Sequence, residues 1–593
     1  MDEVHPHRSE GNSTMAVTVA EQLVNQLVSA GVKRIYGIVG DSLNPVVDAV
    51  RRTAGIDWVS VRHEEVAAFA AAAEATVTGE LTACAGSCGP GNLHLINGLY
   101  DANRSRVPVI AIASHIPTNQ IGTQFFQETH PDRLFTECSV YSEMISSPSQ
   151  MPRVANTAIA HALGAPGVAV LTLPGDVADE EVSDTAPTVC VTSNRPRVVP
   201  RDENVAELAD AINTAKKVTF FVGAGARDAH DEVIALADAA AAPIGHSLRG
   251  KEVIQYDNPF DVGMSGLLGY GACFEAMNSA ELLVLIGTDF PYDQFLPDEV
   301  RTAQIDIDPT HLGRRTRLDL SVVGDVRETM LALAPLVRRK SNRRFLNSML
   351  KKQETLMDKV VSAYTKKVER TTPIHPEYAA VQLDETAGED TVFTVDTGMC
   401  NVWAARYLTP NGRRRVIGSF LHGSMANAMP HAIGAAFADP SREVVAMCGD
   451  GGLSMLLGDL ITIRHYDLPV KVVVFNNASL GMVKLEMLVE GLPSAFTDSP
   501  TVDYAAIATA IGIPAVRVEH PKDLRKALAG GFDRSGPALI DIVTDPNALS
   551  IPPSITGKQI KGFATAMTKA VLGGGGAEVM SMARSNLRNI PRP

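Results

Sequence analysis

The chain has 593 residues, which at about 100–200 residues per domain predicts several domains. Hydrophobic residues make up 45% and charged residues 20%, values that exclude a largely disordered or collagen-like chain. The formal net charge of −14 argues against a general nucleic-acid-binding protein. The seven cysteines are irregularly spaced and support neither a disulfide framework nor a zinc site, so a reducing cytoplasm suits the chain best.

Short apolar strands alternate with helices from the beginning of the chain. Residues 1–14 are polar and are expected to form a disordered extension rather than a secretory signal, and no apolar run is long enough to span a membrane. The first helix is expected to begin at a T-x-x-E capping box, Thr18 and Glu21, and to end at Gly31. Further strands are expected near 34–39, 57–61, 81–85, 107–113 and 168–174, with helices near 43–53, 65–78 and 91–101. This alternation is typical of a parallel α/β sheet.

Three α/β units of similar size follow one another along the chain. The predicted fold class is therefore α/β, with three doubly wound parallel-sheet domains and a C-terminal tail. A proline-rich linker at 186–201 precedes the second unit, and a charged helical connector at 338–372 precedes the third. The predicted boundaries are 1–14 for the extension, 15–185 for the first domain, 195–340 for the central domain, 365–550 for the third domain and 551–593 for the tail.

Two polar motifs follow neighbouring strands in the third unit. Asp450 lies in a GDGG sequence after the strand at 444–448, and Asn477 ends an NN pair one strand–helix–strand crossover further on. Both are expected at the carboxyl edge of the sheet, where open α/β sheets bind ligands. A carboxylate and an amide suit Mg²⁺ that phosphates also hold, and the glycines let the backbone approach those phosphates. A tight strand–helix turn would explain GDGG alone, but the NN pair at this interval favours the metal.

GDGG followed by NN resembles the metal–diphosphate motif of the thiamine-diphosphate enzymes. Those enzymes carry a pyrimidine-binding, a central and a diphosphate-binding domain in the order predicted here. The likeness is strongest to the pyruvate dehydrogenase (quinone) and pyruvate oxidase subgroup and covers nearly the whole chain, including VRHEEVAAFAA, CAGSCGPGNLHLINGLYD, FQETHP, LHGSMANAMP and AMCGDGG. The resemblance implies that Asp450, Asn477 and the carbonyl of Ser479 are the metal ligands.

The sequence Arg62-His63-Glu64-Glu65 opens a predicted helix. Taken alone, two acids at this place complement the helix dipole. The resemblance instead matches Glu64 to the glutamate that hydrogen-bonds N1′ of the cofactor's pyrimidine ring, which favours the imino form that removes the thiazolium C2 proton. Such acid–base work favours a carboxyl group in apolar surroundings, and residues 66–69 supply them.

Other motifs match the cofactor and substrate pocket of the same family. The glycine loop at 86–92 opens a helix, as an anion cradle would, and Cys88 within it has no evident base that would make it a nucleophile. The resemblance implies that the Gly423 carbonyl accepts from the cofactor's 4′-amino group and that Met425 wedges the cofactor into its bent shape. The other residues predicted to bind thiamine diphosphate are Gly40, Gly89, Asp396, Ser424, Gly451 and Gly452. The residues predicted near the substrate are Phe126, Gln127, Met482, Val483 and Glu486.

Some polar residues of these motifs have an equally good structural interpretation. A generic surface loop explains Glu128 and Glu486 as well as a substrate contact does. The histidines of the motifs are expected to be structural rather than catalytic, His422 having the best position among His94, His115, His422 and His431.

The central unit carries glycine turns and acidic residues at its predicted strand ends. The sequence 223–225 follows a strand but lacks the third glycine of the dinucleotide fingerprint. Together the turns suit a ligand with a ribose and a diphosphate, and the resemblance implies FAD; an empty central domain is the alternative. The predicted FAD-binding residues are Gly223, Gly225, Arg249, Gly250, Gly263, Met264, Ser265, Gly266, Asp289, Asp306 and Asp308.

The tail is basic, with six lysines and arginines and one acid from residue 558 onward. After a glycine hinge at 573–576, Val579, Ala583 and Leu587 recur at helical spacing, with Arg584 on another face. A basic amphipathic segment of this kind can lie on an anionic membrane, and the resemblance implies lipid binding. A terminal arm docked on its own subunit is the alternative.

The resemblance implies oxidative decarboxylation of pyruvate to acetate and CO₂, with electrons passed through FAD to ubiquinone or menaquinone. It also implies a homotetramer, cytoplasmic and peripherally attached to the inner face of the cell membrane through the tail. Three alternatives remain open: an acetolactate synthase-like non-oxidative carboligase, an oxygen- and phosphate-dependent pyruvate oxidase, and a non-catalytic nucleotide-binding scaffold.

Overall fold

The computed structural model describes residues 17–182, 197–549, 565–566, 576–586 and 588. Contacts within the chain divide it into two compact units, residues 1–194 and 195–593. The predicted extension 1–14 lies outside the described residues, as do most of the predicted linker and much of the predicted tail. In the part of the chain that is described, no helix has the length and apolar character needed to cross a membrane.

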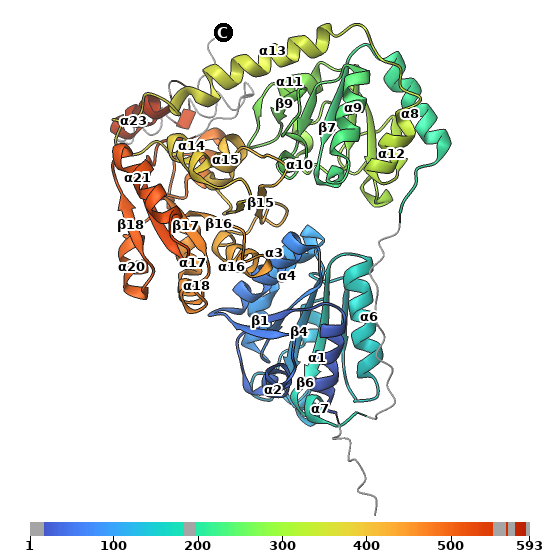
Figure 1. Ribbon diagram of the computed structural model, residues 1–593, viewed down its shortest axis with the longest axis vertical. Coiled ribbons are helices and arrows are strands. Elements are labelled where there is room, and N and C mark those ends of the chain that lie inside the picture. Colours follow the sequence, from blue (N-terminus) through green and yellow to red (C-terminus); the bar gives the residue numbers. More distant parts are fainter. Residues whose placement is uncertain (1–16, 183–196, 550–564, 567–575, 587, 589–593) are drawn as a thin grey trace, which may run out of the picture. The chain divides into compact units, whose positions relative to one another are not determined.

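The first unit is built on a six-stranded parallel sheet with the strand order β2-β1-β3-β4-β6-β5 (Figure 1). Its strands are β1 (Arg34–Gly37), β2 (Asp57–Ser60), β3 (Thr82–Gly86), β4 (Val109–His115), β5 (Tyr141–Met144) and β6 (Val168–Pro174). Its helices are α1 (Val19–Ser29), α2 (Asn44–Arg52), α3 (Glu64–Thr78), α4 (Pro90–Ser105), α5 (Pro131–Leu134), α6 (Met151–Gly164) and α7 (Gly175–Asp179).

Helices cover both faces of this sheet. Helices α1, α2 and α6 share one apolar core with alternate residues of the central strands, whereas α3 packs against α4 and contacts β1 and β3 outside that core. The predicted capping box is present, since Glu21 donates its N–H to Thr18 Oγ1 at 3.2 Å and Thr18 donates its N–H to Glu21 Oε2 at 2.8 Å. Helix α1 ends at Ser29, just before Gly31, whose φ of 92° favours glycine.

The second unit contains two sheets. Its first sheet has seven strands in the order β10-β9-β8-β7-β11-β12-β13, all parallel except β10, which runs antiparallel to β9. The strands are β7 (Val218–Val222), β8 (Ile244–His246), β9 (Asp261–Met264), β10 (Tyr270–Gly271), β11 (Leu282–Ile286), β12 (Arg301–Asp306) and β13 (Leu320–Val323). The helices are α8 (Asp202–Thr214), α9 (His230–Ala240), α10 (Lys251–Ile254), α11 (Cys273–Asn278), α12 (Val326–Leu333) and α13 (Arg344–Lys359).

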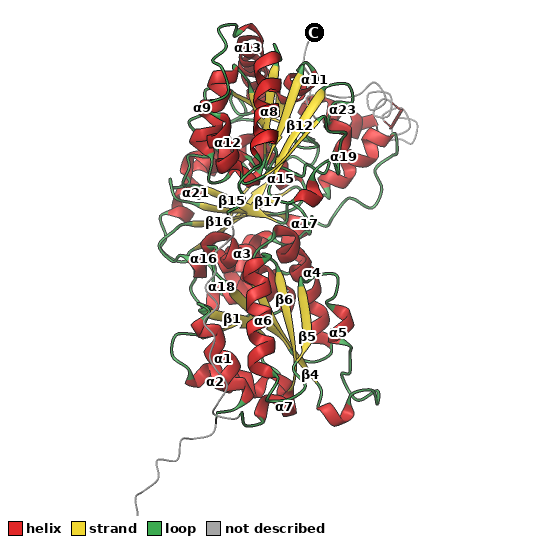
Figure 2. Cartoon of the chain, turned by 90° about the vertical axis from the view of Figure 1, so that its right-hand side faces the viewer, coloured by secondary structure: helices red, strands yellow, loops and turns green. Residues whose placement is uncertain are grey.

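The other sheet of the second unit has six parallel strands in the order β15-β14-β16-β17-β19-β18. Figure 2 labels three of them, β15, β16 and β17. The strands are β14 (Val392–Val395), β15 (Arg415–Gly418), β16 (Val444–Gly449), β17 (Val470–Asn476), β18 (Ala515–Val518) and β19 (Ala538–Val543). The helices are α14 (Pro376–Thr386), α15 (Met399–Tyr407), α16 (Ala428–Ala438), α17 (Asp450–Met455), α18 (Leu460–His465), α19 (Gly481–Glu490), α20 (Tyr504–Ile511), α21 (Pro521–Phe532) and α23 (Gly576–Asn586). The prediction of three α/β domains is confirmed, with β10 as an antiparallel addition.

Buried polar contacts join the two sheets of the second unit. The carboxylate of Glu252 in α10 accepts the backbone N–H of Val416 at 2.7 Å and lies 3.3 Å from the guanidinium of Arg415, both in β15. The Arg406 guanidinium in α15 donates to the carbonyl oxygen of Gly269 at 3.1 Å. Because these charged groups are buried, their pairing fixes how the two sheets meet.

Helix α23 of the predicted tail packs on the rest of the second unit. Met582 is buried in a small apolar cluster with leucines of α19. The Tyr364 hydroxyl donates to the carbonyl oxygen of Arg584 at 3.0 Å. Of the predicted apolar face, Val579 is half-buried, and Leu587 lies outside the described residues. In this structure the helix is docked on its own chain.

Candidate active site

The predicted site residues of the first unit lie in loops that follow neighbouring strands. Gly40 follows β1, Glu64 follows β2, and the 86–92 loop follows β3. Since these strands are neighbours in a parallel sheet, the three loops meet at its carboxyl edge. The approach is close, because a Cβ atom on Gly40 would come within 2.3 Å of the hydroxyl oxygen of Ser87.

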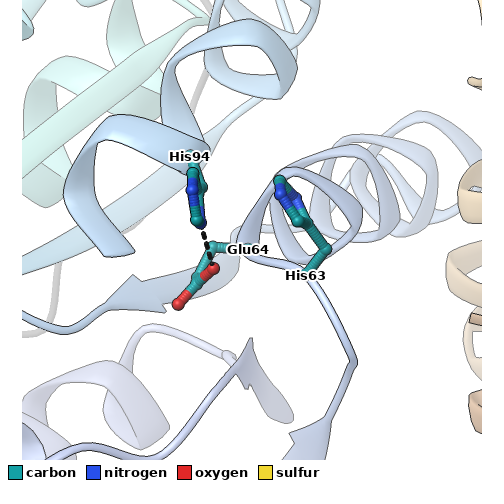
Figure 3. A group of neighbouring side chains, drawn as sticks. All are labelled: His63, Glu64 and His94. Atoms are coloured by element: carbon teal, nitrogen blue, oxygen red, sulfur yellow. Dashed lines mark hydrogen bonds and ion pairs between the residues drawn. The ribbon is translucent and has the colours of Figure 1, made fainter. Parts of the chain in front are cut away.

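Glu64 is the first residue of α3, and only 7% of it is exposed. Its Oε2 atom lies 2.9 Å from Nδ1 of His94 in α4 (Figure 3). Gly91 lies on the other side of the carboxylate, where an added Cβ atom would be 3.1 Å from Oε1. His94, which was expected to be structural, therefore has the predicted catalytic acid as a partner. Local sequence patterns do not reveal a contact between residues 30 positions apart.

The loop at 122–128 lies against the glycine loop after β3. The thiol of Cys88 donates to Gln127 Oε1 at 3.4 Å, and a Cβ atom on Gly89 would lie 2.8 Å from the Gln127 carbonyl oxygen. Phe126 is 76% exposed, which leaves its ring free to contact a ligand or another surface. Glu128 accepts backbone N–H groups of its own loop, which lowers the pKa of its carboxyl group. Glu128 therefore shapes the loop that holds Gln127.

The predicted metal ligands lie on neighbouring strands of the C-terminal sheet. Asp450 begins α17 directly after β16, and Asn477 follows β17. Burial raises the pKa of the Asp450 carboxyl group to about 6, and the backbone N–H groups of Asn477 and Ala478 act in the opposite direction. The side-chain oxygen of Asn477 accepts the N–H of Ser479 at 3.0 Å, which folds this turn toward Asp450. A buried carboxylate beside amide and carbonyl oxygens is the donor set that fits Mg²⁺.

Two residues that the sequence analysis did not single out hold this turn. The Tyr504 hydroxyl donates to the carbonyl oxygen of Asp450 at 2.9 Å. The fully buried Asp541 carboxylate accepts from the Asn476 side chain at 2.9 Å and from the backbone N–H of Tyr504 at 3.1 Å. The sequence feature that could have indicated Asp541 is its position as a single acidic residue inside the apolar strand β19.

Asp396 follows β14 and is almost completely buried. Its Oδ1 atom accepts the backbone N–H of Asn427 at 3.1 Å, whereas its Oδ2 atom has no hydrogen-bond partner among the described residues. Burial raises the pKa of Asp396 to about 7. A Cβ atom on Gly452 would come within 1.8 Å of Oδ2, so only glycine fits beside this carboxyl group. An unsatisfied buried oxygen of this kind suits a bound ligand that donates a hydrogen bond.

The predicted segment Gly423-Ser424-Met425 lies next to these acids. The Asn427 side chain donates to the Ser424 carbonyl oxygen at 2.8 Å and thereby positions the segment. Gly423 has a φ of 77°, which favours glycine. The Met425 methyl group would lie 3.5 Å from a Cβ atom on Gly451. The methionine and the turn after β16 are therefore neighbours, as a site for one ligand requires.

The predicted substrate residues of the second unit all lie on α19, which begins shortly after Asn477. Met482 is half-buried and packs on the core, Val483 is 44% exposed, and Glu486 is exposed. The structure therefore presents Val483 and Glu486 on the surface of this helix.

Most of the predicted FAD residues lie in loops at the carboxyl edge of the central sheet, whereas Gly263 and Met264 lie in β9 and Asp306 ends β12. Gly223 follows β7, Gly250 follows β8 and Ser265 follows β9. A Cβ atom on Gly250 would lie 2.2 Å from the Val222 carbonyl oxygen, so glycine is required there. The buried Ser265 hydroxyl has no hydrogen-bond partner among the described residues, and an unused donor fits the oxygens of a nucleotide ligand.

The predicted acids of the central domain have partners within it. Asp289 pairs with the guanidinium groups of Arg314 at 2.9 Å and Arg315 at 3.2 Å. The Asp306 carboxylate accepts the N–H of Asp308 at 3.0 Å. These acids therefore also stabilise the loops in which they lie.

This fold and these sites define a cofactor-dependent α/β enzyme. Three domain families match the chain: the N-terminal TPP binding domain of thiamine pyrophosphate enzymes at residues 17–134, their central domain at 205–333, and their C-terminal TPP binding domain at 396–542. The chain belongs to the thiamine pyrophosphate enzyme family, thiamine pyrophosphate being another name for thiamine diphosphate.

Relatives extend this similarity over most of the chain. A Bacillus subtilis protein, YdaP, whose name describes it as thiamine pyrophosphate-containing, is 35% identical over 94% of this chain and 96% of its own length. A pyruvate oxidase of Lactiplantibacillus plantarum is 29% identical over 88% of this chain and 87% of its own. An acetolactate synthase of Mycobacterium bovis is 30% identical over 86% of this chain and 85% of its own. These relatives agree with membership of the thiamine pyrophosphate enzyme family, but their names state different reactions.

Proposed function

We propose that this chain oxidatively decarboxylates pyruvate to acetate and CO₂ and passes the electrons through FAD to a membrane quinone. The observation that carries the proposal is the joint presence of a buried carboxylate–amide turn at Asp450 and a central sheet edge that fits a nucleotide at Ser265. The relative named a pyruvate oxidase supports the same substrate.

In this proposal, Asp450, Asn477 and the Ser479 carbonyl oxygen hold Mg²⁺ and, through it, the diphosphate of the cofactor. Glu64 exchanges a proton with the cofactor's pyrimidine ring, because the apolar residues of α3 keep bulk water from its carboxyl group. Met425 supplies the bulky apolar contact beside the metal turn. When bound, thiamine diphosphate would supply a carbon nucleophile toward the 2-oxo acid and an electron sink for decarboxylation.

The central domain would hold FAD, which supplies a two-electron acceptor when bound. Ser265 would donate its free hydroxyl to the ligand, and glycines at positions such as 225 and 250 would leave the backbone accessible. Residues 126, 127, 482, 483 and 486 are proposed to contact the substrate. Each of these assignments predicts a loss of cofactor or substrate affinity when the residue is changed.

We further propose that the basic tail binds an anionic lipid surface, at the inner face of the cell membrane, where the quinone acceptor is found. The charge excess of the tail and the exposed side chain of Arg584 support this attachment. In the structure α23 is docked through Met582, so membrane binding would compete with that contact. A homotetramer is proposed as the assembly and is tested by light scattering of the purified protein.

A second candidate is an acetolactate synthase-like carboligase, which relatives such as the Mycobacterium bovis protein favour. The two candidates differ in their products and in their need for an electron acceptor. The holoenzyme with pyruvate and a soluble quinone analogue should yield acetate and CO₂ in equal amounts, with quinone reduced in step. Formation of acetolactate without quinone reduction would contradict the proposal. Formation of acetyl phosphate together with peroxide would mean that the electron acceptor is oxygen and not a quinone.

A further inference from the structure

Glu64 and its two histidine neighbours form a compact group at the beginning of α3. The buried Glu64 carboxylate lies 2.9 Å from Nδ1 of His94, and the rings of His63 and His94 stack with centroids 4.3 Å apart (Figure 3). The side chain of His94 is 44% exposed, whereas that of Glu64 is 9% exposed. His94 therefore reaches from the buried carboxyl group to the surface of the chain.

His63 caps the N-terminus of α3 and does not contact Glu64 through a hydrogen bond among the described residues. Its Nδ1 atom accepts the backbone N–H of Glu65 at 3.2 Å and so caps α3, which leaves the ring proton on Nε2. Burial, followed by the charge of His94, lowers the pKa of His63. The neutral ring of His63 thus covers one face of the His94 ring without competing for Glu64.

The same geometry argues against a metal ion at this place. Ligand atoms of His63, Glu64 and His94 lie within 4.8 Å of one another, a spacing that could hold a cation. A metal on Nε2 of His63 would displace its proton, which would have to move to Nδ1 and break the helix cap. Proton exchange needs no such rearrangement.

We propose that His94 carries protons between solvent and Glu64. A proton that arrives from water at Nε2 lets the Nδ1 proton move to the Glu64 carboxylate, and the reverse movement returns it to water. Only N–H and O–H bonds form and break, one for one, and no oxidant or reductant is needed. This role rests on the proposed function, in which Glu64 exchanges a proton with the bound cofactor. His94 acts through Glu64 and is therefore a positioning and proton-relay residue.

The charged and titratable neighbours of this relay come from two helices. Glu64 faces His94 directly, His63 stacks on it from the N-terminus of α3, and Glu65 lies 4.0 Å from His63. Asn97 in α4 donates to Glu65 at 2.7 Å, which holds that second acid away from His94. Glu64 is therefore the carboxylate with which His94 exchanges protons in this proposal.

The test measures exchange of the thiazolium C2 proton of the bound cofactor in D₂O, by acid quench and proton NMR, with neither pyruvate nor flavin turnover. In His94→Ala the exchange rate should fall at least about tenfold, and added imidazole should restore it in proportion to its concentration. Cofactor affinity should stay within about threefold, since His94 acts on proton transfer rather than binding. The control His161→Gln, at an exposed histidine of α6, should exchange like the unmodified enzyme.

Two results would overturn the relay: exchange that is unchanged in His94→Ala, or exchange that is lost with normal cofactor affinity and is not restored by imidazole. His94→Gln, which keeps a hydrogen-bonding side chain, should be as slow as His94→Ala if the role is proton transfer, and a normal rate in His94→Gln would also contradict it. Glu64→Gln separates the two proposals. If exchange stays fast in that variant, the proposed role of Glu64 fails; if it falls there but not in the His94 variants, the relay alone fails.

Discussion

The hydroxyl of Tyr504 donates a hydrogen bond to the backbone carbonyl oxygen of Asp450, with 2.9 Å between the two oxygen atoms. The same tyrosine donates its backbone N–H to Asp541 at 3.1 Å, and Asp541 also holds Asn476, the residue before the proposed ligand Asn477. A single buried carboxylate therefore supports both halves of the proposed metal site. Such supporting residues orient ligands that bind the metal directly.

Tyr504→Phe should weaken Mg²⁺-dependent binding of thiamine diphosphate by about tenfold, because it removes the hydrogen bond that fixes the backbone of Asp450. Titration calorimetry of the metal-loaded cofactor gives the dissociation constant. Tyr466→Phe, after the end of α18, is the matched control and should bind normally. Equal affinity in the two variants would mean that Tyr504 has no part in the site.

Asp450→Ala should abolish metal-dependent cofactor binding while leaving the fold intact. The buried carboxylate has a raised pKa because burial disfavours its charge, so removing it relieves desolvation even as it deletes the proposed ligand. The expected result is a loss of affinity of at least about a hundredfold with an unchanged or higher unfolding temperature. If chelation of Mg²⁺ from the unmodified protein left cofactor binding intact, the proposed metal site would be wrong.

His375 links α23 to the N-terminus of α14 in a pH-dependent way. Its Nε2 atom donates to the Ser585 carbonyl oxygen at 3.1 Å, and its Nδ1 atom pairs with the Glu377 carboxylate. Burial alone would lower the pKa of His375, but the hydrogen bond and charge of Glu377 outweigh it, and the net effect raises the pKa. The resulting stabilisation is complete below about pH 6.5 and is lost as the pH rises through the higher folded-state pKa.

Thermal unfolding of the unmodified protein and of His375→Gln tests whether this stabilisation decreases as the pH rises. The protein should exceed the variant in unfolding temperature most at about pH 6, and the difference should shrink toward about pH 8. Comparing the two proteins at each pH cancels the titration of all other groups. A difference that stays constant or grows with rising pH would show that protonated His375 does not stabilise the fold.

Charge reversal in the tail tests the proposed lipid surface. Each basic residue near an anionic membrane contributes about 1 kcal/mol, so Arg584→Glu should weaken binding to phosphatidylserine-containing vesicles by about fivefold or more. Sedimentation with vesicles measures the bound fraction, and neutral phosphatidylcholine vesicles provide the baseline. Arg338→Glu, at an exposed position between α12 and α13, serves as the control. Identical vesicle binding in both variants would rule out the tail as the attachment.

Sequence patterns predicted the elements that repeat with a regular period. Apolar strands such as β6 and the capping box at Thr18 were expected within a residue or two, because short-range periodicity and local hydrogen bonds determine them. The two-residue strand β10 was not expected, since so short a segment carries no alternation. Strand ends likewise placed Asp450 and Asn477 at the carboxyl edge of their sheet.

The surroundings of these site residues could not be predicted in the same way. Tyr504, Asp541 and Asn427 act through contacts with segments distant in sequence, which no local pattern specifies. The contact between His94 and Glu64 depends on α4 packing against α3, so it became visible only with the tertiary structure. The same holds for the docking of Met582, because a marginal amphipathic pattern does not say which surface covers it.

The most direct test of the central claim is the absorption spectrum of the flavin. The protein is purified with FAD, thiamine diphosphate and Mg²⁺, oxygen is excluded, and pyruvate is added. We predict that the flavin absorption bleaches and that a soluble quinone analogue restores it, while the flavin of Glu64→Gln remains oxidised over the same time. If the flavin stays oxidised while CO₂ is released, the chain is a non-oxidative enzyme of this family, and the claim of pyruvate oxidation through FAD is contradicted.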